Sequence, residues 1–337
     1  ASAGTSTVMI SYNDKFQSSM SITVNAAAAS SQLTGVTLPT VFQKTAFANI
    51  NLNSFALFDQ YGGSIGLSAG YTITVATTAG LAISNPNITT INPDCTITAP
   101  NATGNYDLVF TLKDPANNTL SSQSMNIQVV DTTGVASYQF EQIGTMYAKA
   151  PANPDYHKLI NITGRTATGV SVQLVYAANG LPEGIQNITS SNAAFDPTVV
   201  SGGRRYLKVD YTGTASSVST TLKAWSTGGA EVASITVTAS AAAQYMQNVY
   251  FKETTKTMSI AGGVDHNFST FLEAKDQYGV DFSLAGVDVY YMTTNSAVIS
   301  VDNATGTFKL IAAGTCTLKA YYPATNRTLE MVVNVTN

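Results

Sequence analysis

The feature that most constrains the fold is an internal repeat of roughly one hundred residues. Four segments that alternate polar and apolar residues end at Val24, Val129, Val237 and Val335, and two of them share the identical run Ser-Ile-Thr-Val. A repeat of this length indicates a tandem array, in which each unit buries a core of its own. The architecture of one unit therefore determines the architecture of most of the chain.

Each closing segment is preceded by another segment in which polar and apolar residues alternate, the pattern of a half-buried strand. These upstream segments are 4–12, 104–112, 218–226 and 314–322. Short polar stretches join the two segments of each pair, at 13–17, 113–119, 227–231 and 323–327. The pattern predicts a β-hairpin at the end of every unit.

The remaining sequence favours an all-β chain. No useful stretch has the 3.6-residue period of an amphipathic helix, and short strand-like segments, about seven per hundred residues, are typical of an immunoglobulin-like sandwich. We predict tandem immunoglobulin-like β-sandwich domains in an elongated array, at 29–131, 132–240 and 241–337. Residues 1–28 are expected to be the C-terminal hairpin of a truncated preceding domain plus a linker, so the chain is expected to be an internal or C-terminal piece of a longer array.

The charge content limits the partners. Only 11% of the residues are charged, against about 25% in average soluble domains, and the formal net charge is −4. We expect no nucleic-acid partner because the sequence has no basic stripe. We expect no membrane insertion because no apolar run approaches the ~18 residues of a spanning helix. Hydroxyl and amide groups must therefore cover most of the surface.

The two cysteines, Cys95 and Cys316, fall in different predicted domains. We expect two separate, reduced and buried thiols, since this is not the cysteine-dense pattern of a small disulfide-bonded scaffold. The first ten residues lack the basic and apolar regions of a secretory signal peptide.

The tetrapeptide DQYG occurs at 59–62 and again at 276–279, two repeats apart. The first copy overlaps the pattern G-x-S-x-G at 62–66, which in hydrolases marks a nucleophile between a strand and a helix. Here a strand-like segment follows instead, so we interpret both copies as turns between strands. In this interpretation Asp59 and Asp276 accept backbone N–H groups, while Gly62 and Gly279 adopt positive φ.

The sequence offers no catalytic constellation, and we predict that the chain is not an enzyme. Its two histidines, His157 and His266, stand alone in separate domains. Carboxylates are sparse, although a glycosidase pair could assemble across strands. Structural Ca²⁺ is the one cofactor considered, because oxygen ligands converge at domain junctions. The candidate ligands are Asp59, Asp131 and Asp276, and the alternative for Asp59 and Asp276 is that each caps its own turn.

The segment 296–322 resembles the bacterial Ig-like (BIG-type) domain pattern, with Val301-Asp302 ending a strand, an N-x-x-G turn at 303–306 and A-x-G-T at 312–315. The two DQYG turns, in tandem units of low charge, resemble those of surface-layer (S-layer) proteins of the Bacillus group. The likeness is weakest in the second domain, where GRTATG (164–169) stands in place of DQYG.

The resemblance implies a non-catalytic module of a self-assembling lattice on the bacterial cell surface. The implied partners are other copies of the protein, and a cell-wall polymer bound by regions outside this chain. The alternative is an Ig-like stalk or binding module of an adhesin or carbohydrate-binding protein, because similar modules occur there as well.

Overall fold

The computed structural model describes residues 4–12, 16–77, 80–260, 264–323 and 326–337. Strands dominate it, and the helical elements of the described part are short 3₁₀ turns, η1 (Leu52–Ser54), η2 (Thr132–Gly134), η3 (Pro154–Tyr156) and η4 (Phe268–Thr270). In this part of the chain no helix has the length and apolar character needed to cross a membrane. The predicted all-β fold is confirmed. The expected turn residues 13–15 and 324–325 lie outside the described residues.

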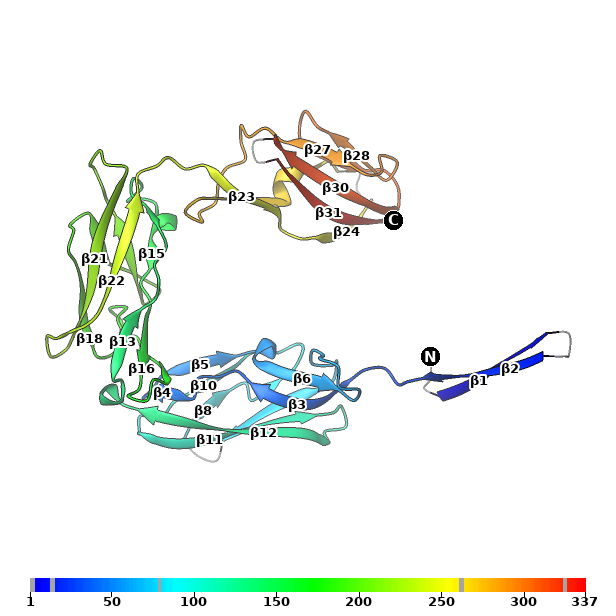
Figure 1. Ribbon diagram of the computed structural model, residues 1–337, viewed down its shortest axis with the longest axis horizontal. Helices are drawn as coiled ribbons and strands as arrows, with labels where there is room; N and C mark the ends of the chain where they lie inside the picture. The colour runs from blue at the N-terminus through cyan, green and yellow to red at the C-terminus, as the bar shows by residue number, and fades with distance from the viewer. Residues whose placement is uncertain (1–3, 13–15, 78–79, 261–263, 324–325) are drawn as a thin grey trace.

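Three β-sandwiches follow one another along the chain (Figure 1), and all three pair their strands by the same plan. The first strand of each domain pairs antiparallel with the strand that leads into the DQYG turn or its counterpart. These pairs are β3 (Ser30–Val36) with β6 (Phe55–Asp59), β13 (Ser137–Phe140) with β16 (Ile162–Arg165), and β23 (Met246–Phe251) with β26 (Leu272–Asp276).

The last strand of each domain pairs parallel with a short early strand. These pairs are β12 (Thr119–Val130) with β4 (Val41–Gln43), β22 (Glu231–Ser240) with β14 (Met146–Tyr147), and β31 (Arg327–Thr336) with β24 (Thr255–Ser259). The other edge of each last strand forms the predicted terminal hairpin, with β11 (Gly104–Lys113), β21 (Ser217–Ser226) and β30 (Gly314–Tyr322).

The remaining strands complete each sandwich. The hairpins are extended by β7 (Thr72–Thr77) with β9 (Asn87–Ile88), by β18 (Ile185–Ser190), and by β27 (Tyr290–Thr293). Small three-stranded sheets have the orders β5 (Phe47–Ile50), β10 (Cys95–Thr98), β8 (Ala82–Ser84); β15 (Lys158–Leu159), β20 (Arg204–Val209), β19 (Phe195–Ser201); and β25 (His266–Asn267), β29 (Thr307–Leu310), β28 (Ile299–Asp302).

Each sandwich encloses its own hydrophobic cluster, spread over residues 33–129, 140–239 and 249–335. The clusters follow from alternation, because successive side chains of a strand point to opposite faces. In β11, for example, Leu108, Phe110 and Leu112 are fully buried while the residues between them are partly exposed. Cys95 and Cys316 are free, buried and in different clusters. Burial raises the pKa of the Cys95 thiol to about 11.

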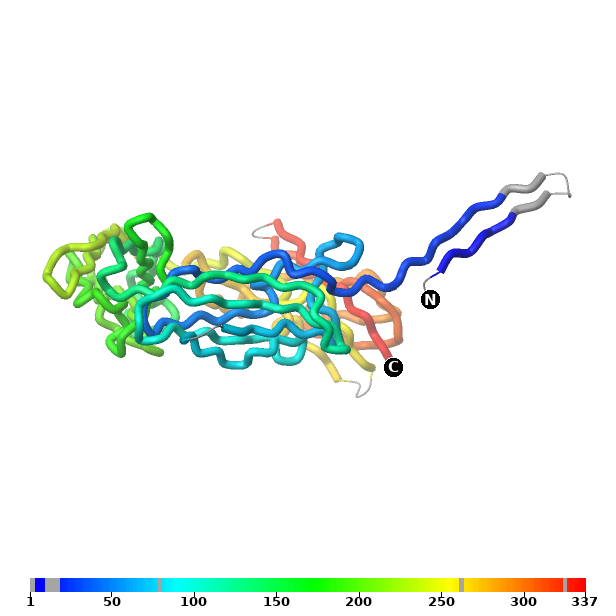
Figure 2. Tube along the Cα trace, turned by 90° about the horizontal axis from the view of Figure 1, so that it is seen from below, coloured from blue at the N-terminus to red at the C-terminus, as the bar shows by residue number. Residues whose placement is uncertain are grey.

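The N-terminal hairpin of β1 (Gly4–Tyr12) and β2 (Phe16–Val24) stands away from the first sandwich (Figure 2). Its strands pair with each other in the register Gly4 to Val24, and the described residues contain no third strand paired with them.

The chain bends at both junctions, so that the first and third domains lie on the same side of the second (Figure 1). At the first junction the backbone sheet is continuous, because β4 pairs with β12 on one edge and with β17 (Ser171–Gln173) of the next domain on the other. This pairing produces an eight-stranded sheet that spans two domains.

Candidate functional site: the domain junctions

The second DQYG turn is built around the carboxylate of Asp276. Its Oδ1 accepts the backbone N–H groups of Tyr278 and Val280, each at 2.9 Å. Gly279 donates its N–H to the Asp276 carbonyl at 3.0 Å and has a φ of 82°. This is a three-residue hairpin loop whose left-handed position favours glycine.

The first copy has the same geometry. Oδ1 of Asp59 accepts the N–H groups of Tyr61 and Gly63, each at 2.8 Å, and Gly62 again has a φ of 82°. Asp and Gly are therefore the residues that shape the turn, and the structure places all four predicted turn residues in these roles.

The middle residues of DQYG hold the preceding linker. Gln277 donates from Nε2 to the Ala243 carbonyl at 2.8 Å, and its Oε1 accepts the N–H of Tyr245 at 2.9 Å. The Tyr278 hydroxyl donates to the Ala242 carbonyl at 2.8 Å. Three hydrogen bonds from the turn thus hold a linker whose residues 242–245 are exposed.

The first DQYG turn binds its linker with the same atoms. Gln60 donates to the Ala27 carbonyl at 2.8 Å and accepts the N–H of Ala29 at 2.9 Å, while the Tyr61 hydroxyl donates to Ala26 at 2.8 Å. The sequence interpretation missed this role. The available signal was that Gln and Tyr recur with Asp and Gly, although a turn alone does not need them.

The junction between the second and third domains adds side chains from the second domain. The Tyr156 hydroxyl donates to Oδ2 of Asp276 at 2.8 Å, and Nζ of Lys158 donates to the Tyr278 carbonyl at 2.7 Å. The ring of Tyr147 lies 5.1 Å from the rings of both Tyr156 and Tyr278. Burial, and then the hydrogen bond to Asp276, raise the pKa of Tyr156.

The second domain forms the same turn from different residues. Thr166 replaces the aspartate, and its Oγ1 accepts the N–H of Val170 at 3.1 Å. Gly169 donates to the Thr166 carbonyl at 2.9 Å and has a φ of 83°. Ala167 and Thr168 occupy the places of Gln and Tyr, so this turn has no long polar side chains with which to hold the linker.

The first junction is instead stabilised by sheet pairing and by a buried amide. Gln43 is fully buried, and its Oε1 accepts the N–H of Val175 in the second domain at 2.9 Å. Gln173 donates from Nε2 to the Phe47 carbonyl of the first domain at 3.0 Å. A small apolar cluster also crosses the junction, consisting of Val41, Val135, Val172 and Leu174.

The three calcium candidates lie at three separate places. Asp59 lies in the turn that binds the linker following β2, Asp276 lies at the second junction, and Asp131 caps η2 at the first. Oδ1 of Asp131 accepts the hydroxyl of Thr133 at 2.6 Å and its N–H at 3.0 Å. The hydroxyl bond is the main cause that lowers the pKa of Asp131. Within the described residues, no three His, Cys, Asp or Glu side chains gather as a metal site. Calcium binding stays a prediction.

The candidate nucleophile pattern at 62–66, and a second match to G-x-S-x-G at 66–70, lie in a strand connection. Ser64 bridges to Phe58, and Oγ of Ser68 accepts the N–H of Ser30 at 2.9 Å. Strand β7 follows, whereas a nucleophile elbow needs a helix there. His157 contacts the Pro151 carbonyl through Nε2 at 3.1 Å, and the His266 ring stacks on Phe308.

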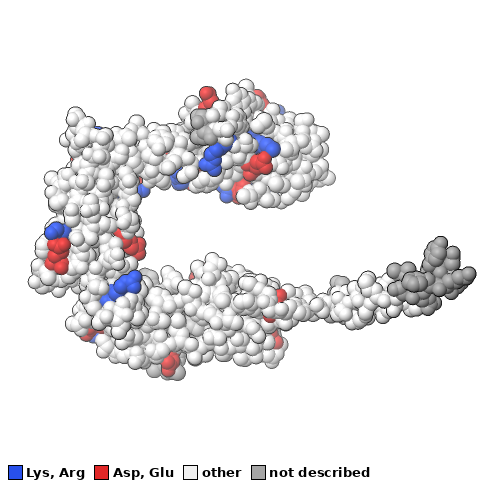
Figure 3. All heavy atoms as spheres, in the orientation of Figure 1, with Lys and Arg blue, Asp and Glu red and all other residues white. Residues whose placement is uncertain are grey.

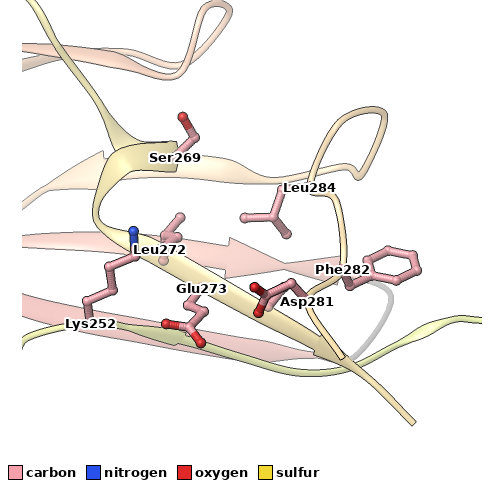
Figure 4. Close-up of a pocket in the computed structure, with 8 residues that line it drawn as sticks. Lys252, Ser269, Leu272, Glu273, Asp281, Phe282 and Leu284 are labelled. Atoms are coloured by element: carbon pink, nitrogen blue, oxygen red, sulfur yellow. The ribbon is translucent and has the colours of Figure 1, made fainter. Parts of the chain in front are cut away.

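A shallow pocket of about 340 Å³ opens on the third domain, between β26 and the chain that follows it (Figure 4). Glu273 and Asp281 supply its carboxylates, and both form ion pairs with Lys275. Nζ of Lys252 donates to the Thr270 carbonyl at 3.0 Å. These charged groups therefore stabilise the surface around the turn and leave no unpaired acid and base facing each other.

No protein-family model matches the chain, and the search of curated proteins gives no match. Among solved structures, the chain is similar to domains 4–9 of the surface layer protein SbsC, with 17% identity and a TM-score of 0.32 over 98% of this chain and 54% of that one. A structure of SbsC domains 1–6 gives 14% identity and a TM-score of 0.26 over 100% of this chain and 45% of that one. The chain thus spans about half the length of these structures.

The D00-D0 domain of intimin is also similar, with 12% identity and a TM-score of 0.22 over 59% of this chain and 100% of that one. At these identities and TM-scores the likeness does not assign a function.

Proposed function

We propose that this chain is a non-catalytic structural module of a self-assembling bacterial surface layer, made of domains at 29–131, 132–240 and 241–337. Its partners would be other copies of the protein, in a two-dimensional lattice on the outside of the cell. Attachment to a cell-wall polymer would belong to other parts of the polypeptide. Calcium, if it binds, would have a structural role at a junction.

The observation that carries this proposal is the surface itself. Figure 3 shows charged side chains widely spaced over a surface of other residues. Several of them are neutralised in ion pairs, as in Lys223 with Glu231 and Lys319 with Glu330. Neighbouring copies can then approach through hydroxyl and amide groups without strong charge repulsion.

The junctions support the same role. A lattice subunit must present its side contacts at fixed positions, which requires that its domains keep their orientation. Here one junction continues a β-sheet across two domains, and the other buries the Asp276 carboxylate with the rings of Tyr156 and Tyr278, against which the partly buried Tyr147 packs. Inter-domain motion is the default for small polar interfaces. The contacts at these two junctions restrict that motion, as a structural module of a lattice requires.

The experiment is to follow assembly of the full polypeptide as its concentration rises, by sedimentation and by electron microscopy. The proposal predicts ordered sheets above a threshold concentration. Persistent monomers that bind cells or glycans would instead support the adhesin or carbohydrate-binding module.

A further inference from the structure

The two DQYG turns differ in what covers them. In the second copy Asp276 is 1% exposed and Tyr278 is 5% exposed. In the first copy Asp59 is partly exposed and Tyr61 is 51% exposed, although both turns make the same internal and linker hydrogen bonds. The difference therefore comes from outside the turn.

The second DQYG turn is shielded from solvent by the domain that precedes it. Tyr156, Tyr147 and Lys158 all belong to that domain and all contact the turn. At the first copy, no donor among the described residues reaches Oδ2 of Asp59, the atom that corresponds to the acceptor of the Tyr156 hydroxyl. Gly63 also stands where Val280 packs against this cluster, which leaves more room for an incoming side chain.

A second, independent observation concerns the hairpin β1–β2. Its pairs Gly4 with Val24 and Val8 with Met20 place Val8, Met20, Ile22 and Val24 on one face. The terminal hairpin of the third domain has the same register and apolar residues at the corresponding positions of this face, with Gly314 opposite Val335 and Leu318 opposite Met331. In the third domain this face is closed by the opposing sheet, and Leu318, Met331, Val333 and Val335 are 0%, 1%, 0% and 4% exposed.

On β1–β2 the corresponding side chains are open. Val8, Ile22 and Val24 are each 41% exposed, and Met20 is 59% exposed. The opposite face carries Thr5, Thr7, Ser21 and Thr23, together with Met9, which is 68% exposed. The hairpin thus has the inner face of a sandwich without the second sheet.

We propose that the apolar face of β1–β2 and the Asp59–Tyr61 face of the first DQYG turn together form one docking site for the body of an Ig-like domain. The occupant is the set of remaining strands of the domain that β1 and β2 complete, contributed by the same polypeptide ahead of them. That body presents a tyrosine hydroxyl, or an equivalent donor, to Oδ2 of Asp59. This docking does not depend on lattice formation.

The test uses a fusion in which a second copy of residues 132–217 precedes Gly4 of the chain. In the register of the second domain, β1–β2 then takes the place of β21–β22, with Val8 for Leu222 and Val24 for Ala239. The added body brings Tyr147, Tyr156 and Lys158 toward the first DQYG turn. Hydrogen exchange read by mass spectrometry follows the backbone amides of 19–24 and 61–63.

We expect exchange at both sets of amides to slow by tenfold or more relative to the unfused chain. Tyr156→Phe in the added copy should restore fast exchange at 61–63 only, while the same change in the original copy should leave 61–63 unaffected. Unchanged exchange at both sets would overturn the proposal.

A second fusion tests the proposal if the added residues 132–217 and β1–β2 do not fold into one domain. Residues 132–239 replace 1–24 ahead of Asn25, so a complete domain with its own hairpin faces the Asp59–Tyr61 face. Slower exchange at 61–63, reversed by Tyr156→Phe in the added domain, supports the proposal, and no change in a folded added domain contradicts it. If the unfused chain dimerises and protects 19–24, the occupant is a second copy and the proposal is wrong.

Discussion

The hydroxyl of Tyr156 in the second domain donates a 2.8 Å hydrogen bond to Oδ2 of Asp276 in the third. Asp276 is almost completely buried and receives two further hydrogen bonds from backbone N–H groups of its own turn. A buried carboxylate is tolerated only when donors replace the water it has lost. The same residue therefore shapes the turn and ties the turn to the neighbouring domain.

Replacing Tyr156 with Phe should destabilise the second junction without disturbing the tyrosine rings. The ring remains, but one buried carboxylate oxygen loses its donor and Nε2 of Gln244 loses its acceptor, which costs about 1–3 kcal/mol. Denaturant unfolding of the full chain should show the loss. Tyr61→Phe is the matched control, because it removes an exposed hydroxyl from the other turn and should cost less. Equal losses in the two variants would contradict the proposed role of burial.

Replacing the buried Asp276 should cost more stability than replacing the partly exposed Asp59. Asp59→Ala removes the cap of a partly exposed turn and should cost about 1 kcal/mol, as at other short-range Asp caps. Asp276→Ala leaves three buried donors without an acceptor and should cost several times more. Chemical denaturation of both variants measures the difference. A similar small loss at both sites would show that the contact with Tyr156 adds nothing.

The turn glycines should not tolerate a side chain. Gly62 and Gly279 both have a φ of 82°, where L-residues are disfavoured, so Ala at either position should cost about 1–2 kcal/mol. A Cβ at either position would meet nothing within 4 Å, so the cost would be conformational rather than steric. Gly66→Ala, in open space and without a positive φ, is the control and should change the melting temperature little.

Raising the pH should weaken the second junction. The pKa of Tyr156 is raised in the folded chain, mainly by burial, so the folded state favours the neutral phenol. The stabilisation is complete below the ordinary tyrosine pKa of about 10 and declines as the pH rises from there through the raised pKa. Small-angle scattering should detect opening of the junction in alkaline solution. Tyr156→Phe should lose the part of this pH dependence that belongs to Tyr156, and an identical pH profile in the variant would refute the assignment.

The strands and turns that depend on a local residue pattern could be predicted from the sequence. Alternation along 104–112 and 314–322 predicted the strands of the terminal hairpins, and Asp followed three residues later by Gly predicted the turns at 59–62 and 276–279. The pairing of β4 with both β12 and β17 could not be predicted, because Val41–Gln43 is three residues long and its partners lie far away in sequence.

The side-chain contacts of the second junction could not be predicted for a related reason. Tyr147, Tyr156 and Tyr278 are far apart in sequence and meet only through the interdomain angle. The roles of Gln277 and Tyr278 depend on a linker whose path no local pattern specifies. The turn-capping role of Thr166 was not predicted, because its hydroxyl accepts the backbone N–H that a carboxylate accepts in the DQYG turn.

Electron microscopy of the purified full polypeptide, imaged over a range of concentrations, tests the proposed function most directly. A structural module of a surface layer predicts two-dimensional ordered sheets that form without any other component of the cell. Dispersed particles at every concentration, together with binding to cells or glycans, would contradict that proposal and favour a binding module.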